Sequence, residues 1–264
     1  TINTTRSDRV VFSSRIFHHD DLRVLLRLGG AARGSAMSAQ KLGAGVHTLL
    51  FDLDGTLYPI ENGYEEKVRE RVFEFMVDEL KVPSIEQAKE MWWEHFKVYN
   101  QTLRSLRQGM GFEFDRDKYW SHVRGDPADF LQANFDALEM LRSFPGCKKF
   151  VLTNCAEKQA IEALQVLGLE GGFDGVYGAD FMGDVCKPER AAFEAVCARA
   201  KIDPNGTVFF EDSVKNLVTA KEMGFTTVLV RGKTAAEEAG QNGGFKPDAT
   251  ISAVNLKELR EALP

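Results

Sequence analysis

The stretch Phe51-Asp52-Leu53-Asp54-Gly55-Thr56-Leu57 directly follows the apolar run Thr48–Phe51 and is the most informative part of the sequence. Acids beside a glycine are ordinary turn residues. A turn alone does not explain a carboxylate at the end of a buried strand, because desolvating a charge costs free energy unless a cation or hydrogen bonds compensate. Parallel strands carry ligand sites at their carboxyl ends, and Gly55 permits a sharp turn there. We therefore expect Asp52 and Asp54 to project into a crevice that holds a cation.

Three further apolar runs are typical of strands, at Phe150–Thr153, Thr207–Phe210 and Thr226–Val230. Each is followed by polar or glycine residues and then by a helical period, as in parallel α/β sheets. About a hundred residues without a comparable strand separate the first run from the second. The sequence thus predicts an α/β fold, a Rossmann-like parallel sheet core with an inserted small helical cap domain.

The inserted segment carries apolar residues at helical spacing in three places. The spaced residues are Val68, Val72, Phe75 and Met76; Ala88, Trp92, His95, Phe96 and Tyr99; and Leu131, Phe135, Leu138 and Leu141. Ser84 with Gln87 fits a capping box, and Asp126 before Pro127 fits an N-cap followed by a proline at the first helical position. We expect the cap over residues 60–144 and the core over residues 46–59 and 145–264.

Residues 1–45 differ in charge from the rest, with seven Lys or Arg against three acids, whereas the remainder has 26 against 36. Five serines and an Arg-spaced apolar run at Leu22–Leu28 are compatible with an organelle transit peptide, which would place the protein in a chloroplast or mitochondrion. Alternatively, Met37 is the start of a cytoplasmic protein and residues 1–36 are an unstructured extension. Neither interpretation makes residues 1–45 part of the fold.

Composition excludes several classes of protein. Hydrophobic residues at 44% and charged residues at 27% are ordinary globular usage, and no run of 18 apolar residues occurs, which excludes disorder throughout and a membrane span. A net charge of −6 argues against a nucleic-acid partner, because non-specific affinity for a polyanion comes from clustered Lys and Arg. The four cysteines show no zinc-site spacing, which favours a reducing compartment.

Polar groups follow the other strands as well. They are the pairs Thr153-Asn154, Lys187-Pro188 and Glu211-Asp212. A threonine alone is a common strand residue, and a single lysine is usually a solvated charge. Pro188 at a helix start would fix the chain direction beside Lys187, and Glu211-Asp212 poses the same desolvation problem as Asp52. Together these groups are the ingredients of metal-assisted phosphoryl transfer at one sheet edge.

In this order, the motifs resemble the haloacid dehalogenase superfamily of hydrolases, which is recognised by Asp-x-Asp-Gly-Thr, a Thr or Ser after the second strand, a Lys and a terminal acid pair. The match covers residues 46–262. The long separation of the first two motifs resembles the branch that has a helical cap after the first strand.

The resemblance implies a magnesium site. The carboxylates of Asp52 and Asp212 and the backbone carbonyl of Asp54 would hold Mg²⁺, with Glu211 acting on its water shell, since hard oxygen ligands suit that ion.

The resemblance also implies a reaction through an aspartyl phosphate formed on Asp52. Asp54 would protonate the leaving alkoxide and later activate water. Thr153 and the backbone amide of Asn154 would hold phosphate oxygens, while Lys187 would neutralise developing charge. Family members that displace halide from carbon need no acid at the position of Asp54, so dehalogenation is disfavoured.

A cap that closes over the crevice and excludes water favours a small phosphorylated metabolite as the substrate. We expect Asn100 and Arg104 of the cap to contact it, out of a wider set of polar groups of which most would be surface or packing residues. That set is Tyr58, Asn62, Tyr64, Tyr99, Asn100, Arg104, Lys118, His122 and Arg124.

More closely, the chain resembles the pyrimidine 5′-nucleotidase-like group of plants, algae and fungi in Leu57-Tyr58-Pro59, Tyr99–Leu103 and Phe210–Asn216. Two departures are Glu211, where many relatives have Asp, and Val123-Arg124-Gly125 in place of Val-His-Gly. The resemblance implies hydrolysis of a nucleoside 5′-monophosphate. The alternatives are a sugar-phosphate or phosphoglycolate phosphatase, a phosphomutase and a non-catalytic binding protein.

Overall fold

The structure is a computed structural model that describes residues 45–231 and 244–263. The chain divides into two units, Thr1–Ala36 and Met37–Pro264, and every described residue belongs to the second. The transit peptide or extension expected over residues 1–45 therefore lies outside the described residues, apart from Gly45.

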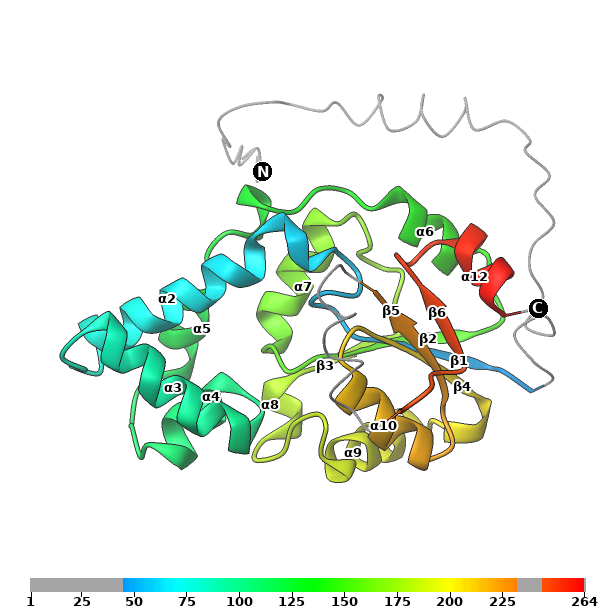
Figure 1. Cartoon of the computed structure of the whole chain (residues 1–264). Helices are drawn as coiled ribbons and strands as arrows, with labels where there is room; N and C mark the ends of the chain where they lie inside the picture. The colour runs from blue at the N-terminus through cyan, green and yellow to red at the C-terminus, as the bar shows by residue number, and fades with distance from the viewer. Residues whose placement is uncertain (1–44, 232–243, 264) are drawn as a thin grey trace, which may run out of the picture. The chain divides into compact units, whose positions relative to one another are not determined.

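The core is a parallel sheet of six strands in the order β3-β2-β1-β4-β5-β6, which confirms the predicted α/β fold (Figure 1). The strands are β1 (Thr48–Phe51), β2 (Lys148–Leu152), β3 (Gly175–Tyr177), β4 (Thr207–Glu211), β5 (Thr226–Val230) and β6 (Ala249–Ile251). The four predicted strands match β1, β2, β4 and β5. The short strands β3 and β6 were not predicted.

Helices cover both faces of the sheet. They are α6 (Phe135–Arg142), α7 (Glu157–Val166), α8 (Ala179–Met182), α9 (Arg190–Ala200), α10 (Val214–Glu222) and α12 (Leu256–Ala262). Because successive strand residues point to opposite faces, Leu49 and Phe51 pack with residues of α6, α7 and α12, whereas Leu50 packs with residues of α9 and α10. Strand β1 is buried on both faces, as its continuous apolar run predicts.

Four helical elements form a separate group (Figure 1), and their buried apolar residues share one cluster with Cys155, Ala156 and Ala179 of the core. They are α2 (Tyr64–Asp78), α3 (Ile85–Tyr99), α4 (Thr102–Arg104) with the π-helical turn Ser105–Gly109, and α5 (Arg116–Arg124). Ser84 is the N-cap of α3, as one half of the predicted capping box, because its Oγ accepts a hydrogen bond from the Gln87 amide at 3.3 Å. Within the described residues, no helix has both the length and the apolar character needed to cross a membrane.

Helix α6 does not belong to this group, although its spacing was predicted as that of the third cap helix. Its buried residues Ala137, Met140 and Leu141 pack on the sheet, and Phe135 is 75% exposed. The third long helix of this group is α5 instead, because its residues Tyr119, Trp120 and Val123 belong to the same apolar cluster as α2 and α3. Pro127 begins only a short 3₁₀ turn, capped by the Asp126 side chain. This packing favours a cap that ends near Arg124 rather than at residue 144.

Candidate active site

Three carboxylates converge where β1 and β4 end. Phe51 pairs with Phe210 in the parallel register, and the Asp52 amide donates to the Phe210 carbonyl at 2.9 Å, which sets Asp52 beside Glu211. Asp52, Glu211 and Asp212 each offer an oxygen, and these three atoms lie within 4.8 Å of one another. Acids that are far apart in the sequence therefore lie together at this edge of the sheet, as expected.

Lys187 lies between two of these acids and is only 2% exposed. Its Nζ is 2.7 Å from Asp52 Oδ1 and 2.7 Å from Glu211 Oε2. Burial favours the neutral amine, but the charges of Asp52 and Glu211 outweigh it and hold the pKa of Lys187 above its ordinary value. Lys187 is therefore a positioned ammonium. Helix α9 begins at Arg190, so Pro188 precedes the helix and is not its first residue, contrary to the prediction.

Glu211 has its oxygens occupied by groups of the chain. Oε1 accepts from the Ser213 amide at 3.0 Å, and Oε2 accepts from Asn216 Nδ2 at 2.9 Å as well as from Lys187. Burial alone would raise its pKa, but the charge of Lys187 and hydrogen bonds with Asp212, Lys187 and the Ser213 amide hold the pKa below the ordinary value. These contacts favour Glu211 as an anchor for Lys187 over the expected action on a metal's water shell.

Asp52 and Asp212 are the carboxylates that most need a counter-charge. Burial, followed by repulsion from Glu211, raises the pKa of each well above its ordinary value. Gly55 has φ +80°, and a Cβ there would overlap the Asp212 carboxylate, so glycine is required for this close approach. Two carboxylates in a buried site fit a hard divalent cation, which would offset the repulsion.

Thr153 and Asn154 follow β2, as predicted. Thr153 is 1% exposed, and its Oγ1 accepts from the Cys155 amide at 3.1 Å. The Asn154 side chain pairs with the backbone of Lys187: Oδ1 accepts from the Lys187 amide and Nδ2 donates to its carbonyl, both at 3.0 Å. Asn154 therefore holds the lysine segment against the end of β2, a contact that the sequence did not reveal.

Asp54 is held by an arginine of the cap. Arg124 is 3% exposed; its Nη2 lies 2.8 Å from Asp54 Oδ1, and its Nη1 lies 3.0 Å from Glu65 Oε1. The Tyr58 hydroxyl donates to Asp54 and is 3.0 Å from Glu65 Oε1. Burial, together with the charge of Asp54, raises the pKa of Tyr58, which keeps the hydroxyl a donor. Arg124 and Tyr58 thus fix the orientation of the Asp54 carboxylate, and Glu65 holds both of them.

Arg124 is itself fixed at the end of α5. Its carbonyl accepts from the Tyr64 hydroxyl and from Arg71 Nη1, both at 3.0 Å, and its guanidinium lies 4.7 Å from the Tyr64 ring centroid. Gly125 has φ +56°, and a Cβ there would overlap the Arg71 guanidinium. Sequence reasoning placed Tyr58 and Arg124 only in a broad set of polar groups and missed Glu65. The triplet Val123-Arg124-Gly125 was the available signal.

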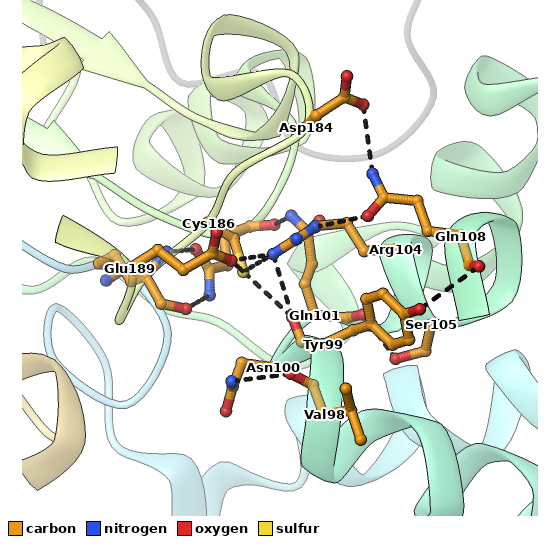
Figure 2. A network of polar contacts seen from close by, with 12 residues as sticks. Val98, Tyr99, Asn100, Gln101, Arg104, Ser105, Gln108, Asp184, Cys186 and Glu189 are labelled. Atoms are coloured by element: carbon orange, nitrogen blue, oxygen red, sulfur yellow. Dashed lines mark hydrogen bonds and ion pairs between the residues drawn. The ribbon is translucent and has the colours of Figure 1, made fainter. Parts of the chain in front are cut away.

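Arg104 and Asn100, expected to contact substrate, join the cap to the core. Figure 2 shows the Arg104 guanidinium directed at Glu189, with which it forms an ion pair, and at Cys186. Its Nη1 is 3.1 Å from Cys186 Sγ and 3.3 Å from the Tyr99 carbonyl. Asn100 Oδ1 accepts from Lys215 Nζ at 2.9 Å. A substrate contact of Arg104 would have to compete with Glu189.

A cavity of about 210 Å³ lies between the cap and the core. Asp54 and Asn154 contribute the core side, while Phe96, Tyr119 and Trp120 are among its cap residues. A larger cavity of about 570 Å³ is lined by residues around Phe130 and contains none of the site carboxylates. The smaller cavity is therefore the one placed to hold a group attached to a phosphate near Asp52.

Comparison with known proteins identifies the family. The model of the haloacid dehalogenase-like hydrolases matches residues 46–224, more than half of the chain. The chain belongs to this family of hydrolases.

Solved structures of this family share the fold. The HAD phosphatase from Thermococcus onnurineus is 23% identical with a TM-score of 0.57, and the L-2-haloacid dehalogenase from Xanthobacter autotrophicus is 18% identical with a TM-score of 0.53. A putative HAD-hydrolase from Bacillus subtilis, bound to magnesium, is 19% identical with a TM-score of 0.53. Each similarity covers 82% of this chain and 97% of the other.

Proposed function

We propose that this hydrolase is a magnesium-dependent phosphatase that cleaves a small phosphate monoester through an aspartyl phosphate on Asp52. One observation carries the proposal: Asp52 and Asp54 are held by separate cations, Lys187 at 2.7 Å and Arg124 at 2.8 Å. The two carboxylates therefore have different surroundings. Such a difference suits a nucleophile and a proton-transfer group that act in one reaction.

The metal would be held by the carboxylates of Asp52 and Asp212 and by the backbone carbonyl of Asp54. When bound, Mg²⁺ would neutralise phosphoryl oxygens and reduce the repulsion between the phosphate and the attacking carboxylate. The raised pKa values of Asp52 and Asp212 support this site, because they reflect buried negative charge without a sufficient counter-charge. The magnesium bound in the similar Bacillus subtilis structure supports the choice of ion.

The residues of this chain divide the reaction into two displacements. A carboxylate oxygen of Asp52 attacks phosphorus, the bond from phosphorus to the ester oxygen breaks, and Asp54 gives its proton to the leaving alkoxide. Asp54 then takes a proton from water as the water oxygen attacks phosphorus, which releases phosphate and regenerates Asp52. Lys187, with Thr153 and the amide of Asn154, would stabilise the negative charge of the transferred group.

The presence of Asp54 favours a phosphatase over a dehalogenase, although structures similar to this chain include both. A halide leaves as a stable anion and needs no proton, whereas an alkoxide requires one. The contacts from Tyr58 and Arg124 fix the Asp54 carboxylate, which supports its role as the group that delivers such a proton. Measurement of halide release from 2-chloropropionate tests this choice, and we expect none.

The substrate we propose is a nucleoside 5′-monophosphate, on the resemblance to the pyrimidine 5′-nucleotidase-like group. A sugar phosphate or phosphoglycolate is the second candidate, and a phosphomutase would use the same residues but return the phosphoryl group to the substrate. The cavity of about 210 Å³ beside Asp54 supports a small leaving group over a protein or nucleic-acid chain.

A panel of phosphate esters tests the proposal directly. The full chain is incubated with Mg²⁺ and nucleoside 5′-monophosphates, sugar phosphates, phosphoglycolate or an aryl phosphate, and inorganic phosphate is measured. We expect phosphate release that is greatest for a nucleoside 5′-monophosphate, is abolished by EDTA and returns with excess Mg²⁺. Absence of release from every ester, or release that EDTA does not affect, would refute the proposed function.

A further inference from the structure

The residues that end helix α3 turn the cap back onto the core. Asn100 has φ 55° and closes the helix, and Gln101 after it is extended. The Tyr99 carbonyl accepts from Cys186 Sγ at 3.3 Å, and Figure 2 shows these cap residues beside Cys186. Gln101 Nε2 donates to the Asn154 carbonyl at 2.7 Å. The cap therefore meets the core directly after strand β2, where the phosphate-binding groups are expected.

Gln101 is held firmly from the side of the cap. It is only 5% exposed, and its carbonyl accepts from the Ser105 amide at 2.9 Å and from Ser105 Oγ at 2.8 Å. Ser105 itself is fully buried. The backbone of Gln101 is thus part of the cap, while its side-chain amide ends on the core. A change in how the cap is seated would move that amide relative to Asn154.

The group that Gln101 contacts is the peptide unit between Asn154 and Cys155. Gln101 binds the carbonyl oxygen of this unit, and its N–H, which belongs to Cys155, donates to Thr153 Oγ1 at 3.1 Å. Because a peptide unit is planar, its carbonyl and its N–H turn together. A rotation that breaks the contact with Gln101 would therefore also move the N–H away from Thr153.

The same peptide unit orients the Thr153 hydroxyl. A hydroxyl oxygen that accepts one hydrogen bond keeps its own hydrogen for another acceptor. The bond from the Cys155 amide fixes one direction at Thr153 Oγ1 and so limits where that hydrogen can point. A donor at the end of β2, next to the strand that carries Asp52, suits an oxygen of the transferred phosphoryl group.

Asn154 also transmits its position to Lys187. Its Oδ1 accepts from the Lys187 amide and its Nδ2 donates to the Lys187 carbonyl, both at 3.0 Å. Lys187 Nζ in turn lies 2.7 Å from Asp52 Oδ1. A shift of Asn154 would thus displace the backbone of the lysine that pairs with the nucleophile. Gln101 therefore contacts the residue that links Thr153 to Lys187.

We propose that Gln101 is a positioning residue for phosphoryl transfer: through its hydrogen bond to the Asn154 carbonyl, the seated cap aligns the Thr153 hydroxyl and the Lys187 segment. The inference rests on the proposed phosphatase function and adds a cap residue to the groups that hold the phosphoryl group in place. Gln101 acts through Asn154. Since every phosphate ester carries the same phosphoryl group, loss of this contact should slow different esters by a similar factor.

The test compares two glutamines of the cap in the full chain with Mg²⁺. Gln101→Met keeps the length of the side chain and removes the donor. We expect kcat for uridine 5′-monophosphate and for an aryl phosphate each to fall by about 10-fold or more, with KM changed by less than about 3-fold, because alignment is lost in the transition state. An unchanged kcat, or a fall for one ester alone, would overturn the inference.

Gln108→Met is the matched control. Gln108 Nε2 also donates from the cap to the core, to Asp184 Oδ1 at 3.2 Å, in a contact that does not involve Asn154 (Figure 2). We expect its kcat to stay within about 2-fold of the unaltered protein, as for an exposed polar contact. A fall equal to that of Gln101→Met would show that any weakened contact between cap and core has this effect, and would overturn the role of Gln101.

Gln101→Asn tests the contact if the methionine variant does not fold, which far-ultraviolet circular dichroism reveals. Asparagine keeps the amide but is one methylene shorter, so the amide no longer reaches the Asn154 carbonyl. We expect kcat to fall by about 10-fold or more, as for Gln101→Met. A folded Gln101→Asn protein with a kcat within about 2-fold of the unaltered protein would contradict the proposal.

Calorimetric binding of orthovanadate with Mg²⁺ separates this inference from the proposed function, because it needs no turnover. Orthovanadate resembles the transferred phosphoryl group, so we expect Gln101→Met to bind it about 10-fold more weakly than the unaltered protein and Gln108→Met do. Weaker binding by Gln101→Met in a protein that releases no phosphate would refute the phosphatase and keep the alignment. Phosphate release with equal orthovanadate binding by all three proteins would refute the alignment and keep the phosphatase.

Discussion

The core and the cap each contain a buried cation shared by two carboxylates, but the two arrangements are built differently. In the core, Lys187 meets Asp52 and Glu211, which are the neighbouring ends of β1 and β4. In the cap, Arg124 meets Asp54 and Glu65, and thus joins helix α5 to the core motif and to α2. The partners of Lys187 are set by one sheet, whereas those of Arg124 depend on how the cap lies.

This difference suggests a division of roles, in which the core carries out the phosphoryl chemistry and the cap selects the substrate. The strand ends hold Asp52 and its counter-charge Lys187 through contacts that lie within the core. The orientation of Asp54 and the shape of the cavity require the cap to be seated as it is here. We therefore expect substitutions in the core to remove activity towards every substrate, and substitutions of cap residues other than Gln101 to reduce it in a way that depends on the leaving group.

The largest effect is expected for Asp52→Asn. The amide is a poor nucleophile, so turnover of every phosphate ester should fall by at least about 10³-fold while the fold is kept. Phosphate release and far-ultraviolet circular dichroism measure the two properties. Activity within about 10-fold of the unaltered protein would show that the core cluster does not carry the chemistry.

Lys187→Ala should cause the next largest effect, on stability. Removing the ammonium leaves two buried carboxylates without their shared partner, which costs about 3–5 kcal/mol of unfolding free energy. Urea denaturation measures the loss. Lys158→Ala is the control, because Lys158 is exposed on α7, and its effect should stay within about 0.5 kcal/mol. Equal stability of the two variants would contradict a tightly coupled core cluster.

Arg124→Ala should lower kcat by about 10- to 100-fold through misplacement of Asp54, with a smaller change in KM. Arg124→Lys keeps a positive charge but cannot contact Asp54 and Glu65 through two separate nitrogens, so it should recover only part of the activity. Arg142→Ala, at an exposed position of α6, is the matched control. A normal kcat in Arg124→Ala would break the proposed link between the cap and the proton-transfer group.

Arg104→Ala should have the smallest effect. Its partner Glu189 is 39% exposed, and ion pairs of that kind contribute about 1 kcal/mol or less. We expect a small fall in the thermal midpoint and a kcat within about 3-fold of the unaltered protein. A loss of activity as large as that of Arg124→Ala would instead support the substrate contact that the sequence led us to expect for Arg104.

The sequence predicts the sheet where its strands are long and buried. The runs at β1, β2, β4 and β5 are continuous and apolar, because central parallel strands are covered on both faces. Strands β3 and β6 have three residues each, which is too short for a pattern to emerge. Helix α5 was missed because four of its nine residues are charged, so its apolar face consists of few positions.

The core of the candidate site was predictable, whereas its contacts with the cap were not. Polar groups that end parallel strands must meet at one edge, so the approach of Asp52 to Glu211 and Asp212 follows from topology. The contact of Arg124 with Asp54 spans 70 residues and depends on the packing of α5. The pairing of Asn154 with the Lys187 backbone spans 33 residues and depends on a loop conformation. Neither contact can be predicted from a local sequence pattern.

The central claim is that Asp52 accepts the phosphoryl group. Rapid quenching in acid of a reaction with a ³²P-labelled ester, followed by mass spectrometry of the digested chain, tests it directly. We predict label on the peptide that contains Asp52, appearing before phosphate release is complete and absent in Asp52→Asn. Phosphate release without a labelled protein, or label on a different side chain, would contradict the account.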